Sequence, residues 1–433
     1  MSKRKVLCTG LVMAVLAGVV YASGGREKSP GEVTIQVAYP VAVDAPISDI
    51  LDRYAREFEA QNPGIRIEPV YAGGYPDIRT MLQTTMDGGG APPALSVLLA
   101  TDLFDLANAR YIEPITDLIQ AMPDGQAYLE DFIPVFLSNS YYMDEIWSLP
   151  FQRSAVMLYY NADLLDEAGI RPPSNWGELA EAARALTVRQ NGEVLRWGIE
   201  WPSSWPYWLF QPLAMGAGQN IVGEGDAEVF FDHPDVIAAI EYYNSLSERY
   251  QATPRGVQAS WGNVVPGFVA GDSAMIVHTS GSLARILGQA DFAVGVSGIP
   301  GREGGQFSVP GGGNLYITRG IPEAQRQAAF QFARFLTEPD RVADFSIATG
   351  YIAHRASAFE TPALREYIRQ HPQAGEARQI LATAGKELAL QNLGEVRSIF
   401  HNYLEAAFNR QMTPGEAMRA AQREADEALR DFR

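Results

Sequence analysis

Residues 150–179 read PFQRSAVMLYYNADLLDEAGIRPPSNWGEL and indicate the fold more clearly than any other part of the chain. An apolar strand is predicted over 155–160, and it leads into Asn161 and a short helix. The breaker run GIRPP ends that helix. Asn175 then opens a second helix, with Glu178 three residues on as in a capping box. The segment therefore joins a buried strand to two capped helices.

The rest of the chain repeats this alternation of strands and helices. A strand is predicted over 33–41, an amphipathic helix from Pro46 to the breaker at Asn62, and a second strand over 65–71. This βαβ order predicts a parallel sheet covered by helices. Further buried strands are expected at 95–99, 274–278, 293–299 and 315–318, and residues 322–433 are expected to be almost wholly helical. A chain of 433 residues exceeds the size of a single hydrophobic core, so two lobes are predicted.

Composition excludes several classes of partner. The net charge is −17, with 20% charged and 47% hydrophobic residues. Such an acidic protein is a poor partner for nucleic acid or anionic lipid, whereas a small anion could still be held by a local cluster of donors. We therefore expect a small polar solute and no nucleic acid.

The first 22 residues are predicted to be an export signal. Lys3, Arg4 and Lys5 precede an apolar stretch over 6–20, and the small-residue cleavage site ends at Ala22. Residues 23–32 are expected to form a flexible lead-in. Ser23 stands where a lipoprotein has cysteine, and the one cysteine, Cys8, lies inside the leader. A soluble, exported protein without an acyl anchor or thiol chemistry is expected, and the periplasm is the favoured compartment.

Several segments together resemble one protein family. They are FEAQNPGI at 58–65, GGYPDI at 73–78, GGGAPPAL at 88–95, the segment opened by Pro150, TSGSLARI at 279–286, PGGGNLYI at 310–317 and ATGYIA at 348–353. Their order and spacing resemble the family 1 extracellular solute-binding proteins of ABC importers, and within that family the members that bind sn-glycerol-3-phosphate. The resemblance covers the chain from about residue 33 to the C-terminus.

The resemblance implies a two-lobed periplasmic-binding-protein-like α/β fold with a helical C-terminal region. Crossings between the lobes are expected near residues 152, 277 and 314. Lobe 1 would then hold 33–152 and 278–313, and lobe 2 would hold 153–277 and 314–433. A cleft between such lobes closes over a ligand by a hinge motion. We expect a monomer that hands its solute to the transmembrane subunits of an ABC permease.

The resemblance also implies which side chains contact the ligand. The matching positions are Tyr75, Ser154, Ser280, Gly312, Tyr351 and Arg397, with stacking by Trp205 or a neighbouring tryptophan. Two positions depart from the family pattern. The acidic residue that hydrogen-bonds glycerol hydroxyls falls at Ala100, and the Trp-His pair at the end of the first strand is Ala38-Tyr39.

Some of these residues also have ordinary structural explanations. Arg397 could form a structural ion pair with a residue of another helix, and Ser280 could be a helix cap. The triple glycine could be a flexible loop. Most of the tryptophans are expected in the core, Trp147 and Trp176 among them, whereas Trp201 and Trp205 are expected in the cleft.

The expected ligand is glycerol-3-phosphate or a related phosphorylated polyol. A neutral mono- or oligosaccharide is the alternative within the same fold, because the acidic residue is missing and tryptophans are dense. The chain shows no GxSxG, Walker or HExxH motif, and its five histidines are scattered. We therefore expect no enzyme, cofactor or metal. A carbohydrate-acting enzyme and a sensor that pairs with a membrane kinase remain as further alternatives.

Overall fold

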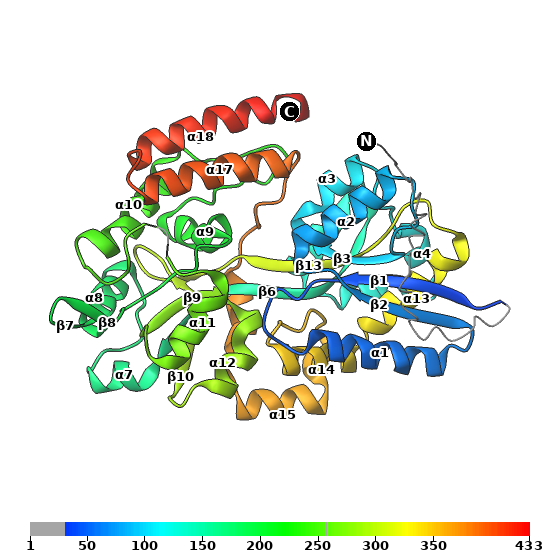
Figure 1. The fold of residues 1–433 in the computed structure, drawn as a ribbon, viewed down its shortest axis with the longest axis horizontal. Coiled ribbons are helices and arrows are strands. Elements are labelled where there is room, and N and C mark those ends of the chain that lie inside the picture. Colours follow the sequence, from blue (N-terminus) through cyan, green and yellow to red (C-terminus); the bar gives the residue numbers. More distant parts are fainter. Residues whose placement is uncertain (1–30, 257) are drawn as a thin grey trace, which may run out of the picture.

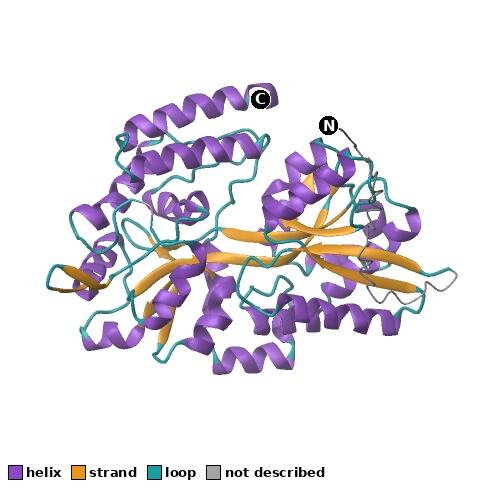
Figure 2. Ribbon diagram, viewed as in Figure 1, coloured by secondary structure: helices purple, strands orange, loops and turns teal. Residues whose placement is uncertain are grey.

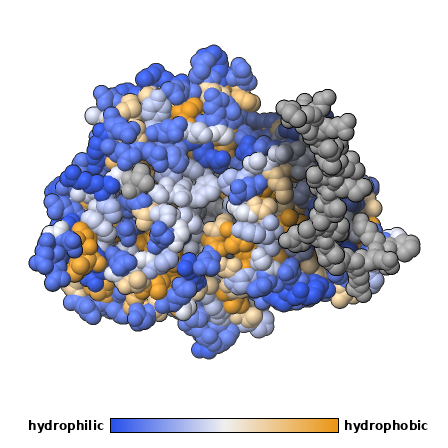
Figure 3. All heavy atoms as spheres, viewed as in Figure 1, coloured by the Kyte–Doolittle hydropathy of each residue, from blue (hydrophilic) through white to orange (hydrophobic). Residues whose placement is uncertain are grey.

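The structure is a computed structural model that describes residues 31–256 and 258–433. The predicted export signal and most of the lead-in lie outside the described residues. The remainder forms two lobes joined by long strands (Figure 1). Helices cover both lobes, and the strands run through the middle of the molecule (Figure 2). No helix among the described residues is long and apolar enough to cross a membrane. The face shown in Figure 3 is mostly hydrophilic, with apolar residues in small dispersed patches.

Lobe 1 begins with the predicted βαβ unit. β1 (Val33–Tyr39) lies between β2 (Ile65–Tyr71) and β3 (Leu95–Leu99) and is parallel to both. The apolar stripe of α1 (Ile47–Gln61) is buried, and Phe58 packs edge-on against Phe332 at 5.1 Å between ring centroids. The other elements of lobe 1 are α2 (Tyr75–Asp87), η1 (Ala100–Asp102), α3 (Leu103–Asn108), α4 (Thr116–Gln120), α5 (Gly125–Glu130), α6 (Pro134–Leu137), η2 (Ser138–Ser140), β4 (Tyr141–Tyr142), β5 (Glu145–Ile146) and α13 (Glu323–Leu336).

Two long strands connect the lobes. β6 (Ser148–Asn161) and β13 (Pro310–Ile317) are antiparallel and pair from Ser148 to Ala155. The end of β13 also pairs with β3, and the distal half of β6 pairs with β9 (Met275–Thr279) and β10 (Val294–Ser297). The result is one seven-stranded sheet that is shared by both lobes.

Lobe 2 begins with the two capped helices that were predicted within residues 150–179. The Asn161 side chain accepts a hydrogen bond from the Leu164 amide at 3.1 Å, and Asn175 accepts one from the Glu178 amide at 2.9 Å, as the sequence predicted. The elements of lobe 2 are α7 (Ala162–Glu167), α8 (Trp176–Leu186), β7 (Val188–Gln190), β8 (Glu193–Arg196), α9 (Pro206–Ala217), α10 (Pro234–Glu248), α11 (Trp261–Ala270), η3 (Ser280–Ser282), α12 (Leu283–Gln289), β11 (Ile299–Pro300), β12 (Gln306–Phe307), α17 (Leu393–Phe408) and α18 (Pro414–Ala428).

The observed division of the chain differs from the predicted one after residue 277. Residues 278–313 were expected in lobe 1, but β9 and β10 pair with the half of β6 that lies in lobe 2. The chain crosses to lobe 1 along β13, and α13 packs there against β1 and β13. It returns through α14 (Pro339–Thr349), α15 (Pro362–Gln370) and α16 (Pro372–Ile380). Because α16 packs against β10, only α16 and the helices after it belong to lobe 2 among residues 314–433. The prediction failed here because the lobe to which a strand belongs depends on which other strand it pairs with, and these pairings join residues that are distant in the sequence.

Candidate functional site

A cavity lies between the lobes, beside the strands that connect them. Its lining comes from both lobes and consists of Ala42, Val43, Tyr75, Leu99, Ser154, Trp205, Tyr207, Trp208, Trp261, Thr279, Gly311, Gly312, Tyr351 and Glu387. Six of these side chains are aromatic, and one is a carboxyl group. Aromatic faces with polar edges suit the C–H surfaces of a sugar or polyol. Among the described residues that line the cavity, none is Lys, Arg or His.

Five of the seven predicted ligand residues line this cavity: Tyr75, Ser154, Trp205, Gly312 and Tyr351. They come from the start of α2, from β6, from the start of α9, from β13 and from the turn after α14. The structure thus brings together residues that are as much as 276 positions apart along the chain, from 75 to 351. Their contact with a ligand remains a prediction.

Ser280 does not line the cavity. It is fully buried, and its hydroxyl accepts a hydrogen bond from the Ala155 amide at 3.1 Å. The residue before it, Thr279, lines the cavity instead. The hydroxyl group expected from the Thr-Ser-Gly-Ser turn is therefore presented one position earlier, because the last residue of β9 faces the cleft.

Arg397 also lies outside the cavity lining. It forms an ion pair with Asp102 of η1, with 3.7 Å between Nη1 and Oδ1, and its guanidinium lies 5.9 Å from the ring centroid of Tyr207. Tyr207 itself lines the cavity. Arg397 therefore lies behind Tyr207, which separates it from the cavity. Its partner Asp102 belongs to the opposite lobe, and this ion pair is the structural alternative that the sequence analysis considered for Arg397.

The tryptophans divide between core and cleft. Trp147, Trp176 and Trp201 are each less than 10% exposed and do not line the cavity. The first two were expected in the core, but the cleft position expected for Trp201 is wrong, because Trp201 packs edge-on against Tyr243. Trp205 lines the cavity and has a φ of +58°, a backbone conformation that non-glycine residues seldom adopt.

Two further tryptophans complete the aromatic wall: Trp208, a neighbour of Trp205 in the sequence, and Trp261, which the sequence did not single out. Trp208 donates a hydrogen bond from Nε1 to the Pro310 carbonyl at 2.8 Å, and its ring lies so close to Gly311 that a Cβ there would stand 2.4 Å from it. Trp261 donates from Nε1 to the Ala42 carbonyl of lobe 1 at 3.2 Å. This hydrogen bond joins the two lobes at the edge of the cavity.

Gly312 has a specific reason to be glycine. Its φ is +96°, and a Cβ at this position would stand 1.8 Å from the Gln152 carbonyl oxygen. β13 can run this close to β6 only because the residue has no side chain.

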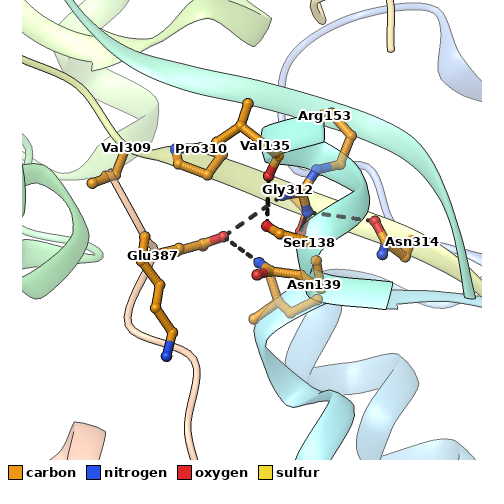
Figure 4. Close-up of polar contacts among 12 residues, drawn as sticks. Val135, Ser138, Asn139, Arg153, Val309, Pro310, Gly312, Asn314 and Glu387 are labelled. Carbon is orange, nitrogen blue, oxygen red and sulfur yellow. Dashed lines mark hydrogen bonds and ion pairs between the residues drawn. The ribbon is translucent and has the colours of Figure 1, made fainter. Parts of the chain in front are cut away.

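Glu387 is the one acidic side chain in the lining, and the sequence did not single it out. It lies in the segment between η5 (Leu381–Thr383) and α17, and it is only 4% exposed. Its Oε2 accepts a hydrogen bond from Asn139 at 3.2 Å and faces Arg153 at 3.8 Å (Figure 4). Burial is the main cause that raises the pKa of Glu387, to about 8, and the positive charge of Arg153 opposes this shift.

Buried histidine adds no charge to the cavity. His278 of β9 is 1% exposed and lies beside Trp261, at 4.1 Å between ring centroids. Burial lowers the pKa of His278 to about 3, so this imidazole is neutral at physiological pH. In the described ranges, no group of three or more His, Cys, Asp or Glu residues could hold a metal ion.

Comparison with known proteins places the chain in a family. Residues 53–372 match the family described as bacterial extracellular solute-binding protein. The sn-glycerol-3-phosphate-binding periplasmic protein UgpB of Escherichia coli K12 is 27% identical over 406 residues, which cover 88% of this chain and 90% of that protein.

Solved structures share the fold. UgpB from Mycobacterium tuberculosis in complex with glycerophosphocholine gives a TM-score of 0.80 at 22% identity, covering 91% of this chain and 98% of that one. Maltose-bound MalE3 of T. maritima gives 0.78 at 22% identity, covering 93% and 100%. With most of its length matched by the family and both lobes matched by solved relatives, this chain belongs to the bacterial extracellular solute-binding proteins.

Proposed function

We propose that this solute-binding protein of an ABC importer captures a small neutral sugar or polyol in the cavity between its lobes. It would do so in the periplasm, as a monomer, and deliver the solute to the transmembrane subunits of the importer. The observation that carries this proposal is the lining of the cavity, which combines six aromatic side chains with one carboxyl group and no cation among the described lining residues. Rings stack on the carbon faces of a polyol, and a carboxyl group reads its hydroxyls.

The size of the cavity supports a small ligand. Its volume is about 60 Å³, room for only a few water molecules. A solute in this site would hold the lobes slightly further apart, and an oligosaccharide would need them well separated. Contacts from both lobes to one small molecule would favour the closed arrangement, which is the state that a permease could recognise.

A phosphorylated polyol, glycerol-3-phosphate in the first place, is the second candidate. The E. coli relative carries that ligand in its name. Arg397 also favours it, because its Nη1 atom is buried without a hydrogen-bond partner among the described residues and its ion pair with Asp102 is long, at 3.7 Å. A phosphate group would have to draw this guanidinium past Tyr207 and away from Asp102.

Calorimetric titration of the mature protein distinguishes the two candidates. The probes are glucose, maltose, glycerol-3-phosphate and glycerophosphocholine, added separately at pH 7.5. Micromolar or tighter binding of glucose or maltose, with no heat from either phosphate compound, is the result we expect. Binding of the phosphate compounds alone would overturn the neutral ligand and favour the second candidate.

A further inference from the structure

A sugar or polyol ligand needs an acceptor for its hydroxyl groups, and the side chain at position 100 cannot supply one. The resemblance places a hydroxyl-reading acid there, but the residue is Ala100, which is fully buried in η1 and does not line the cavity. The carbonyl of Ala100 already accepts a hydrogen bond from the Tyr316 hydroxyl at 3.3 Å, so this carbonyl has a partner within the protein. An acceptor for ligand hydroxyls must therefore come from another element.

Glu387 reaches the cavity from the last connection between the lobes. β6 contributes Arg153, β13 contributes Gly312 and Asn314, and the segment before α17 contributes Glu387, so all three connections meet at one point beside the cavity (Figure 4). Arg153 donates from Nη1 to the Gly312 carbonyl at 3.3 Å and to Asn314 Oδ1 at 3.4 Å. The Arg153 guanidinium is fully buried, so it is held in place beside the carboxyl group of Glu387.

The contacts of Glu387 use one side of its carboxyl group. Both the hydrogen bond from Asn139 and the ion pair with Arg153 end on Oε2. Among the described residues Oε1 has no hydrogen-bond partner, so it is left for a partner in the cavity. A buried carboxylate with one hydrogen bond and an arginine at 3.8 Å is poorly compensated, so a further donor would stabilise its ionised form.

We propose, on the basis of the neutral polyol or sugar ligand proposed above, that Glu387 determines specificity by accepting hydrogen bonds from ligand hydroxyls through Oε1. The acid that the family pattern has near position 100 is thus replaced by one from the connection before α17. Asn139 and Arg153 position the carboxylate and leave its free oxygen directed to the solute.

The charges around Glu387 predict how pH changes ligand affinity. The titratable and charged groups that interact with it are Arg153 of β6, Tyr75 of α2, Tyr207 of α9, Tyr316 of β13, Asp102 of η1 and Arg397 of α17. The pKa of Glu387 in the free protein is about 8, and ligand hydroxyls would favour its ionised form. If only this form binds, affinity for a neutral ligand rises up to about 30-fold from pH 6.5 to pH 9. The affinity for a phosphate dianion would instead fall as pH rises above 7.5, because the ionised Glu387 repels it.

The test is the pH profile of binding in the whole mature protein. Calorimetry with glucose and maltose is run from pH 6.5 to 9 on the wild type, on Glu387→Gln and on Glu376→Gln. Glu376 is the matched control, because burial also raises its pKa and it does not line the cavity. We expect Glu387→Gln to bind at least tenfold more weakly at pH 9 with a flat profile, and Glu376→Gln to match the wild type. Circular dichroism verifies folding.

The outcomes separate the two proposals. Glu387→Gln that keeps wild-type affinity and the wild-type pH profile overturns the role of Glu387 while leaving the ligand class intact. A wild type that binds neither sugar overturns the proposed function, and the inference with it. If Glu387→Gln does not fold, Glu387→Asp replaces it, and a rise of affinity with pH at lower overall affinity is then expected. A folded Glu387→Asp variant with an affinity that does not change with pH, and that is not weaker than that of the wild type at pH 9, overturns the inference.

Discussion

Replacing Arg397 by Met tests whether this arginine binds the ligand or holds the lobes together. Arg397 lies on α17 in lobe 2 and Asp102 on η1 in lobe 1, with 3.7 Å between Nη1 and Oδ1. The Asp102 side chain is 3% exposed and that of Arg397 is 22% exposed. Methionine keeps much of the side-chain volume and removes the charge. The ion pair then no longer stabilises the arrangement in which the two lobes meet.

The magnitude follows from the geometry of the pair. For unit charges 3.7 Å apart, Coulomb attraction is about 1 kcal/mol in water and about 4–5 kcal/mol at an effective dielectric constant near 20. The exposed part of Arg397 and the desolvation of Asp102 reduce the net value, so we expect about 1–2 kcal/mol. Because the pair stabilises the closed state for any ligand, every ligand that binds should lose affinity by the same factor, roughly 5- to 30-fold.

The assay combines calorimetry with small-angle X-ray scattering. Dissociation constants are measured for each sugar or phosphate probe that binds the wild type, and the radius of gyration is measured without ligand. Arg79→Met is the matched control. Arg79 contacts Asp102 at 3.2 Å and Asp105 at 3.1 Å, and all three residues belong to lobe 1. This variant should lower stability without opening the lobes.

Either of two results would refute this reasoning. Loss of phosphate binding alone, with sugar binding unchanged, would mean that Arg397 contacts the ligand as the family resemblance implies. Unchanged affinity for every probe together with an unchanged radius of gyration would mean that the ion pair does not bias closure.

Four other substitutions have definite expected outcomes. Because the folded state binds the Glu387 proton more tightly than the unfolded chain does, wild-type stability should fall as pH rises from 4.5 toward 8; urea unfolding of Glu387→Gln should lack this component. Gly312→Ala places a Cβ 1.8 Å from a carbonyl of β6 at a φ of +96°, so we expect a loss of about 3 kcal/mol or more in urea unfolding. Gly320→Ala, at a φ of +79° but in open space, should lose only about 1 kcal/mol. Trp261→Phe removes the hydrogen bond to the Ala42 carbonyl, worth about 1 kcal/mol, and should weaken ligand binding about fivefold by calorimetry.

The local structure of this protein could be predicted well from its sequence. The alternation of β1, α1 and β2 and the caps at Asn161 and Asn175 depend on residues a few positions apart. The assignment of residues after 277 to lobes could not be predicted in this way. β9 and β13 are both short apolar strands, and only their pairing, with the far half of β6 or with β3, decides to which lobe each leads.

The site was predictable only where a local pattern marked it. Gly312 stands in a recognisable triple-glycine run and Tyr351 in a recognisable turn after a helix, and both line the cavity. Ser280 and Thr279 are adjacent, and the choice between them depends on which one the Ala155 amide engages. Glu387 stands in the unremarkable sequence GKELAL between two helices, and its place in the cavity follows from the path of the last connection. No local signal could have indicated it.

Two arginines beside the cavity, Arg153 and Arg397, support the proposal of a neutral solute. Arg153 faces Glu387 and Arg397 faces Asp102, so each cation is already opposite a buried carboxyl group. A phosphate that drew Arg153 away would leave Glu387 without its cation, which costs several kcal/mol. A phosphate that drew Arg397 away would leave Asp102 paired with Arg79 alone, at 3.2 Å. A sugar hydroxyl requires no such exchange, since it can donate to the free oxygen of Glu387 while Arg153 remains in place. We therefore expect the cavity to favour donors without charge, through ion pairs that also connect the lobes.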